Sequence, residues 1–180
     1  MVCWVLCLRL PVGSGLQIGK TIMAMSEEDL QNLLADPHES LDLELKQWID
    51  PSSPEGTAKI ARACIALWNN NGGRLVIGFT DEGRPDVTSE PNDVRKTFHV
   101  DVIQAIVGRY SAEQFSIEVN FVERGGQTYP VITVPPSVRT PVAAKSTLKL
   151  PDGKELIRDN AVYVRSLEGV WKLEWPGQVC

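Results

Sequence analysis

The segment ALWNNNGGRLVIGFTDEG, residues 66–83, places a glycine pair between the end of an apolar helical pattern and the start of an apolar strand pattern. Loops that bind phosphate run in the opposite order, from a strand through glycines into the N-terminus of a helix. Here the glycines follow the helix, whose nearby end is the negative end of its dipole. The pattern therefore predicts a corner in which Asn and Gly residues end the helix in left-handed conformations, and it argues against an ATP-binding loop.

Helices and strands alternate before this corner. Ser26, followed by acidic residues, predicts the N-cap of a short helix that ends near residue 36. In residues 41–49, leucines alternate with Asp, Glu and Lys, which is typical of a half-buried strand. Ser53 and Pro54 then predict the N-cap and first residue of a longer helix, which runs to the corner.

A second long helix is expected after the corner. Asn92 predicts its N-cap, and Gly108 predicts its end. The residues expected on its apolar face are Val94, Phe98, Val102, Ala105 and Ile106.

The C-terminal part predicts β-structure. Apolar residues alternate in 115–121, and the turn at 124–127 leads into YPVITVP at 129–135, as in a hairpin. Two further strands are expected at 144–150 and 161–165. The order β-α-β-α-β-β-β-β predicts an α+β fold, with a mixed β-sheet and two or three helices.

The chain length of 180 residues fits one domain with a core, which we place at residues 26–170. Residues 1–25 are apolar but lack the basic start of a secretory signal. We expect them to be a disordered leader, or to precede the natural start, and residues 171–180 to form a tail. No apolar run approaches membrane-spanning length, and the four scattered cysteines fit a cytoplasmic protein without a zinc site.

Charge is distributed unevenly. The formal net charge is -5, so a nucleic-acid-binding function requires a local basic patch. Residues 139–172 provide one, with seven basic and four acidic residues and a net charge of +3. Lys145, Thr147 and Lys149 would share one strand face there. Such a face is the footprint expected for contacts with a phosphate backbone, although an ordinary solvated sheet face has the same pattern.

Three segments in this order resemble the Schlafen AlbA-type family, also called divergent AAA-4. They are ESLDLELK at 39–46, the corner segment at 66–83, and YPVITVPPSVRTPV at 129–142, followed by AVYVRS at 161–166. The resemblance covers residues 27–166, and the Gly-Gly-x-Leu-x-Ile-Gly block with its aspartate is its most specific part. It implies a Schlafen AlbA-like fold.

The chain departs from the family pattern at three places. Leu45 stands where the family usually has Phe, and Trp68-Asn69-Asn70 replaces small residues before the glycines. The strand with Arg165 lacks the usual following glycine. None of these changes removes an acidic group.

The resemblance implies nucleic-acid binding, to RNA or DNA, and a possible homodimer. In animal members, three carboxylates cut structured RNA such as tRNA with a divalent metal. The matching positions are Glu39, Glu44 and Asp81, which the resemblance therefore implies as catalytic residues and as ligands of Mg²⁺ or Mn²⁺. We expect phosphate contacts at Lys46, Arg139, Lys145, Lys149 and Arg165.

The residues themselves leave two interpretations of these carboxylates open. If the strands after Glu39 and before Asp81 are neighbours, the three carboxylates could converge. Like charges ~4 Å apart repel by about 4 kcal/mol at an effective dielectric of about 20, so such a cluster needs a cation, either a metal or Lys46. Alternatively, Glu44 and Lys46 form a solvated face, and Asp81 only shapes a turn. The two functional hypotheses are accordingly a phosphate-binding module and a metal-dependent endoribonuclease.

Overall fold

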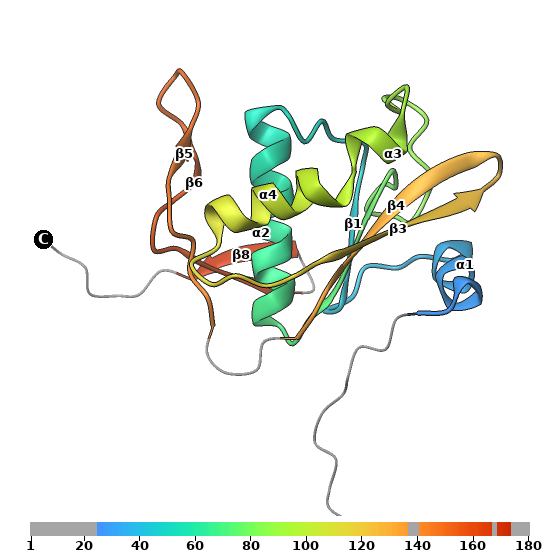
Figure 1. Cartoon of the computed structure of the whole chain (residues 1–180), viewed down its shortest axis with the longest axis horizontal. Coiled ribbons are helices and arrows are strands. Elements are labelled where there is room, and N and C mark those ends of the chain that lie inside the picture. The colour runs from blue at the N-terminus through green and yellow to red at the C-terminus, as the bar shows by residue number, and fades with distance from the viewer. Residues whose placement is uncertain (1–24, 137–140, 167–168, 174–180) are drawn as a thin grey trace, which may run out of the picture.

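The computed structural model describes residues 25–136, 141–166 and 169–173. Its main sheet has four strands in the order β1-β2-β4-β3 (Figure 1). Strand β1 (Leu43–Lys46) runs parallel to β2 (Gly73–Ile77), whereas β4 (Gln127–Val134) is antiparallel to both β2 and β3 (Glu118–Arg124). This mixed sheet confirms the predicted α+β fold.

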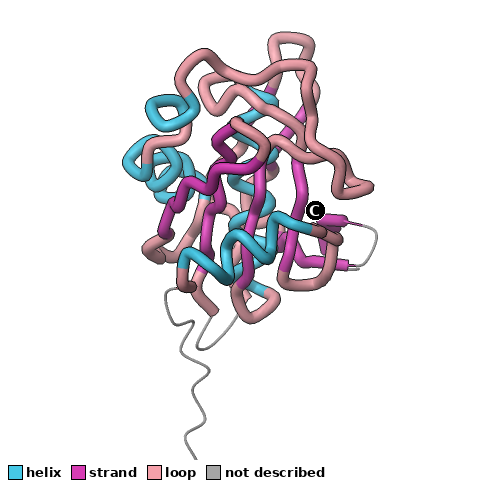
Figure 2. The backbone as a smooth tube through the Cα atoms, turned by 90° about the vertical axis from the view of Figure 1, so that its right-hand side faces the viewer, coloured by secondary structure: helices cyan, strands magenta, loops and turns pink. Residues whose placement is uncertain are grey.

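The helices are α1 (Glu27–Ala35), α2 (Pro54–Asn69), α3 (Val94–Thr97) and α4 (Val100–Tyr110). The predicted caps of the first two are confirmed, because the Ser26 side chain accepts from the Asp29 N–H and the Ser53 side chain accepts from the Gly56 N–H. The segment between β2 and α3, residues 78–93, consists of loops and turns with one isolated bridge (Figure 2).

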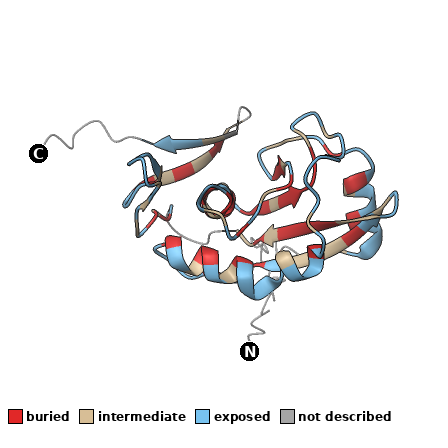
Figure 3. Cartoon of the chain, turned by 90° about the horizontal axis from the view of Figure 1, so that it is seen from above, coloured by how far each residue is buried: buried red, intermediate tan, exposed pale blue. Residues whose placement is uncertain are grey.

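Two small hairpins complete the described part of the fold. The first pairs β5 (Leu148–Lys149) with β6 (Glu155–Ile157), and the second pairs β7 (Val162–Ser166) with β8 (Gly169–Leu173). All four strands contact α2, which lies between the main sheet and the hairpins (Figure 3). Helix α2 is therefore apolar on most of its circumference, as expected for a central helix.

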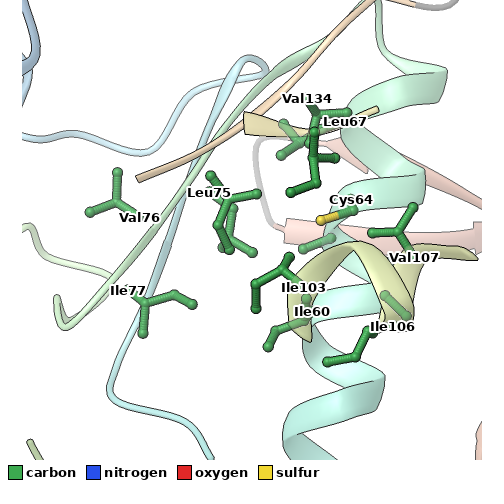
Figure 4. Packing of buried hydrophobic residues seen from close by; sticks show 14 of the residues in the cluster. Ile60, Cys64, Leu67, Leu75, Val76, Ile77, Ile103, Ile106, Val107 and Val134 are labelled. Carbon is green, nitrogen blue, oxygen red and sulfur yellow. The ribbon is translucent and has the colours of Figure 1, made fainter. Parts of the chain in front are cut away.

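The core forms where α2 and α4 pack on the sheet (Figure 4). Ile60 and Cys64 of α2 are fully buried, as are Leu75 of β2 and Ile103 of α4. Burial raises the pKa of the Cys64 thiol to about 12, so the thiol stays protonated and packs as a small apolar group.

The corner after α2 has the predicted conformation. Asn71 and Gly72 have φ values of 72° and 83°, and the Gly72 N–H donates to the Leu67 carbonyl at 2.8 Å. Gly73 has φ 153°, and a Cβ on it would lie 2.5 Å from the Asp42 carbonyl oxygen. The second glycine is thus required because β2 begins in close contact with the segment that leads into β1.

The second long helix differs from the prediction. Asp93 caps α3 in place of Asn92, and the helix stops at Phe98 and restarts with His99 as the cap of α4, which passes Gly108 and ends at Tyr110. The interruption shifts the helical register. The buried face of α4 consists of Ile103, Ile106, Val107 and Tyr110, whereas the expected Val102 and Ala105 are exposed.

The C-terminal strands are shorter and more numerous than predicted. The strand expected at 144–150 is reduced to Leu148–Lys149, preceded by isolated bridges of Ala143 and Ala144. Strands β6 and β8 were not expected, and β8 continues to Leu173, past the boundary we placed at 170. Within 25–136, 141–166 and 169–173, no helix has the length and apolar character that a membrane span requires.

We predict that Gly73→Ala destabilises the fold by about 2–4 kcal/mol, because it adds both backbone strain and a clash with the Asp42 carbonyl. Gly108→Ala is the matched control. A Cβ there meets nothing within 4 Å, and alanine favours the helix by about 0.5–1 kcal/mol. Urea denaturation of both variants measures the difference. Equal stability of the two variants would contradict the role given to Gly73.

Candidate functional site

The three carboxylates that the resemblance implied do come together, and they surround Lys46 at the end of β1. The Lys46 Nζ lies 2.7 Å from Glu44 Oε1, 3.8 Å from Glu39 Oε1 and 3.9 Å from Asp81 Oδ1. The parallel pairing of β1 with β2 explains this convergence, because the chain leaving β2 passes Lys46, whose carbonyl accepts from the Gly78 and Phe79 N–H groups. We call Glu39, Glu44, Asp81 and Lys46 the carboxylate cluster.

Local backbone structure positions the two outer members. Glu39 folds back on β1, and its Oε1 accepts from the Leu45 N–H at 3.2 Å. Asp81 lies in a turn closed by the hydrogen bond from the Gly83 N–H to the Thr80 carbonyl at 2.9 Å. A Cβ on Gly83 would lie 2.1 Å from the Pro37 carbonyl oxygen, so the turn packs directly on the segment that carries Glu39.

Glu44 is the buried centre of the cluster, with 1% relative exposure. Its Oε1 faces Lys46, and its Oε2 forms an ion pair with the Arg165 Nη1. The Arg165 Nη2 also donates to the carbonyl oxygens of Ser40, at 2.6 Å, and Leu43, at 3.1 Å. Burial lowers the pKa of the Arg165 guanidinium, while the charges of Glu39 and Asp42 oppose that change. The structure therefore places Arg165 inside the fold, away from the basic surface on which we expected it.

The carboxylate cluster as arranged does not fit a divalent metal. Both oxygens of Glu44 already face cations, and the Lys46 ammonium occupies the space between the carboxylates. Nowhere in the described ranges do three His, Cys, Asp or Glu side chains stand where they could share a metal ion. With three carboxylates against Lys46 and Arg165, the group has a formal charge of about -1, so its repulsion is largely compensated by protein cations.

The basic region predicted from the sequence is only partly where we expected it. Lys145 and Lys149 are exposed, and the Lys149 Nζ pairs with Glu155 Oε1 at 3.0 Å. Arg139 lies outside the described residues. Lys46, with its charge directed at three carboxylates, lies in the carboxylate cluster and not beside these lysines.

Two further cations gather near Lys149. The pKa of the Glu155 carboxyl is lowered by a hydrogen bond from Lys149, by the charge of Lys149, and by the charges of Arg158 and Lys172. Arg158 and Lys172 were counted in the sequence as part of the basic span but were not named as contact residues. Arg62 of α2 lines a pocket with both of them. The sequence signal that could have identified Arg62 is that it is a single arginine in an otherwise apolar stretch of the helix.

These features define an α+β domain with a compensated carboxylate cluster and a separate group of basic residues on its C-terminal hairpins. The chain belongs to the Schlafen, AlbA_2 family, whose model matches residues 39–172. The resemblance drawn from the motifs is thereby confirmed. No curated protein sequence matches the chain.

Two solved structures are similar in fold. The DIP2311 protein from Corynebacterium diphtheriae is 15% identical with a TM-score of 0.54, over 81% of this chain and 26% of that chain. This likeness supports the fold alone, because the chain spans about a quarter of the DIP2311 protein. The N-terminal domain of a protein from Nitrosomonas europaea, named as related to the ATP-dependent DNA helicase RecG, is 21% identical with a TM-score of 0.46, over 87% and 94% of the two chains.

We predict that Glu44→Gln lowers the free energy of unfolding by about 3–5 kcal/mol, because it leaves the Arg165 guanidinium buried without its counter-charge. Asp81→Asn is the control, since the Asp81 side chain is 75% exposed and such changes stay within about 0.5 kcal/mol. Urea denaturation measures both variants.

A double variant separates charge from packing. In Glu44→Leu with Arg165→Met no buried charge remains unpaired, so we expect it to be more stable than Glu44→Gln. A double variant that is less stable than Glu44→Gln would contradict this account of the pair.

Proposed function

We propose that this domain binds nucleic acid, and that it contacts the phosphates with basic side chains of its C-terminal hairpins. The observation that carries the proposal is that Arg158 and Lys172 line one pocket with Glu155, whose Oε1 pairs with the Lys149 Nζ at 3.0 Å. Membership of the Schlafen, AlbA_2 family supports it, because the resemblance in the motifs implies nucleic-acid binding.

The overall charge makes the position of this basic group decisive. The chain has a formal net charge of -5, so most of its surface repels a polyanion. Binding should therefore depend on a few local contacts. Each phosphate that the protein neutralises on a duplex contributes about 0.9 to the slope of the logarithm of affinity against the logarithm of salt concentration.

The carboxylate cluster is a poor phosphate contact by comparison. With Arg165 included, its formal charge is about -1, and the ammonium of Lys46 is already held by Glu44 at 2.7 Å. A strand lying along Lys145 and Lys149 would avoid these carboxylates. The proposal therefore assigns the phosphate contacts to the hairpins and omits Lys46 and Arg165 from them.

We predict that Lys145→Glu with Lys149→Glu weakens binding to a tRNA-like hairpin or a DNA duplex at least about tenfold and reduces the salt slope by about 2. Fluorescence anisotropy between about 50 and 200 mM salt measures both quantities. The matched control is Arg95→Glu with Lys96→Glu, an equal change of charge on α3, which lies away from β5 and β6 (Figure 1). Equal losses in both double variants would show that only net charge matters, and would contradict the proposed interface.

A second candidate function is a metal-dependent endoribonuclease. The specific observation in its favour is the convergence of Glu39, Glu44 and Asp81, whose carboxylate oxygens lie within 4.0 Å of one Nζ atom. For this function Lys46 would first have to leave the centre of the cluster. Mg²⁺ or Mn²⁺ bound by the carboxylates would then supply Lewis-acid chemistry at the phosphate.

A cleavage assay separates the two candidates. The binding-domain proposal predicts no cutting of tRNA by the native chain with Mn²⁺, Mg²⁺ or EDTA, and unchanged RNA affinity in Asp81→Ala. Asp152→Ala, which removes an exposed carboxylate from the turn between β5 and β6, is the control. Metal-dependent cutting that is lost in Asp81→Ala and kept in Asp152→Ala would favour the nuclease.

A further inference from the structure

A pocket of about 210 Å³ lies between α2 and the two C-terminal hairpins. Three of the residues lining it are basic: Arg62 from α2, Arg158 after β6, and Lys172 from β8. Glu155 is the single acidic residue among its described lining residues, and its Oε1 is already paired with the Lys149 Nζ at 3.0 Å. Among the described residues of the lining, the basic side chains therefore outnumber the acidic one.

Arg62 is held in place on one wall of this pocket. Its Cζ lies 5.7 Å from the centroid of the Tyr163 ring, a cation–π contact that favours this position of the guanidinium. The Arg62 Nε is buried, and no acceptor for it exists within the described ranges. Because the Nε is out of reach of solvent, an anionic ligand in the pocket would accept from the other N–H groups of the Arg62 guanidinium.

The Tyr163 ring that contacts Arg62 is itself held in place by hydrogen bonds. Its hydroxyl oxygen accepts from the Arg158 N–H at 3.2 Å, and its carbonyl accepts from the Asn69 Nδ2 at 2.8 Å. The ring is buried, so Arg62 and the backbone of Arg158 are fixed relative to each other. Sites that bind by charge gain affinity from such preorganisation.

The volume limits the ligand. At about 210 Å³ the pocket is several times the ~30 Å³ occupied by a water in the liquid, yet smaller than the roughly 300 Å³ at which pockets for drug-sized ligands begin. It can therefore enclose a phosphate group but not a nucleobase with its sugar. Leu156 and Val170 supply an apolar side, which reduces screening of the charges by water.

We propose that this pocket binds a phosphate monoester dianion, carried either by the end of a nucleic-acid strand or by a free nucleotide. Three cations favour the monoester, which has a charge of about -1.5 to -2 near neutral pH, over a backbone diester with a single charge. The inference goes beyond the proposed function, because a monoester ligand need not belong to a strand.

The first test compares two oligonucleotides of one sequence, with and without a 5′-phosphate, by fluorescence anisotropy. We expect the native chain to bind the 5′-phosphorylated strand at least about tenfold more tightly. Arg62→Gln should remove this preference and retain binding of the 5′-hydroxyl strand. Lys172→Gln should also remove the preference, and because Lys172 belongs to the proposed phosphate-binding group, it should in addition weaken binding of the 5′-hydroxyl strand. Lys172 lies on an exposed strand position, so its variant tests the pocket even if Arg62→Gln fails to fold.

The second test titrates the native chain with inorganic phosphate and with a nucleoside 5′-monophosphate, followed by amide NMR shifts. Saturable shifts at residues 62, 158 and 172 support the pocket, and stronger binding of the nucleotide than of phosphate identifies a nucleotide source. Equal affinity for the two oligonucleotides, with no shift at these residues, would overturn the pocket and leave the proposed function intact. Nucleotide binding without oligonucleotide binding would keep the pocket and reject the proposed function.

Discussion

The buried ion pair between Glu44 and Arg165 is the interaction on which the rest of the structure depends. Glu44 lies on β1, at the edge of the main sheet, and Arg165 lies on β7, in a separate hairpin. The same guanidinium donates to the Ser40 and Leu43 carbonyls, so it also fixes the segment next to Glu39. Because a buried charge requires its partner, the pair sets the position of the C-terminal hairpins and of the carboxylates together.

Helix α2 provides the second connection between these parts. Its last residue, Asn69, donates to the carbonyls of Val142 and Tyr163 and accepts from the Val142 N–H. After the corner that follows Asn69, the chain enters the main sheet at β2. The corner residues are thus structural. Asn69 holds Val142 and Tyr163 against the helix that carries Arg62, whereas residues 71–73 turn the chain into β2.

Local patterns in the sequence predicted much of this fold, whereas interactions between distant segments were not predictable from them. The caps at Ser26 and Ser53, the corner at 69–73 and the turn at 124–127 depend on neighbouring residues, and each is found. The restart of the helix at His99 was missed, although its cap is local: the His99 Nδ1 accepts from the Asp101 N–H at 3.4 Å. The motifs identified three carboxylates that the structure places close together. The sequence does not show that Arg165 points inward to Glu44, because the two residues are 121 positions apart in the chain.

The structure has two electrostatic regions, the carboxylate cluster, which is compensated by Lys46 and Arg165, and the basic group on the hairpins, which we propose as the phosphate contact. The most direct test of this separation is an amide NMR titration of the native chain with a tRNA-like RNA hairpin. The account predicts the largest shifts at residues 149, 158 and 172, with the signals of residues 39 and 81 unchanged. Shifts centred on residues 39 and 81, with none on the hairpins, would contradict it.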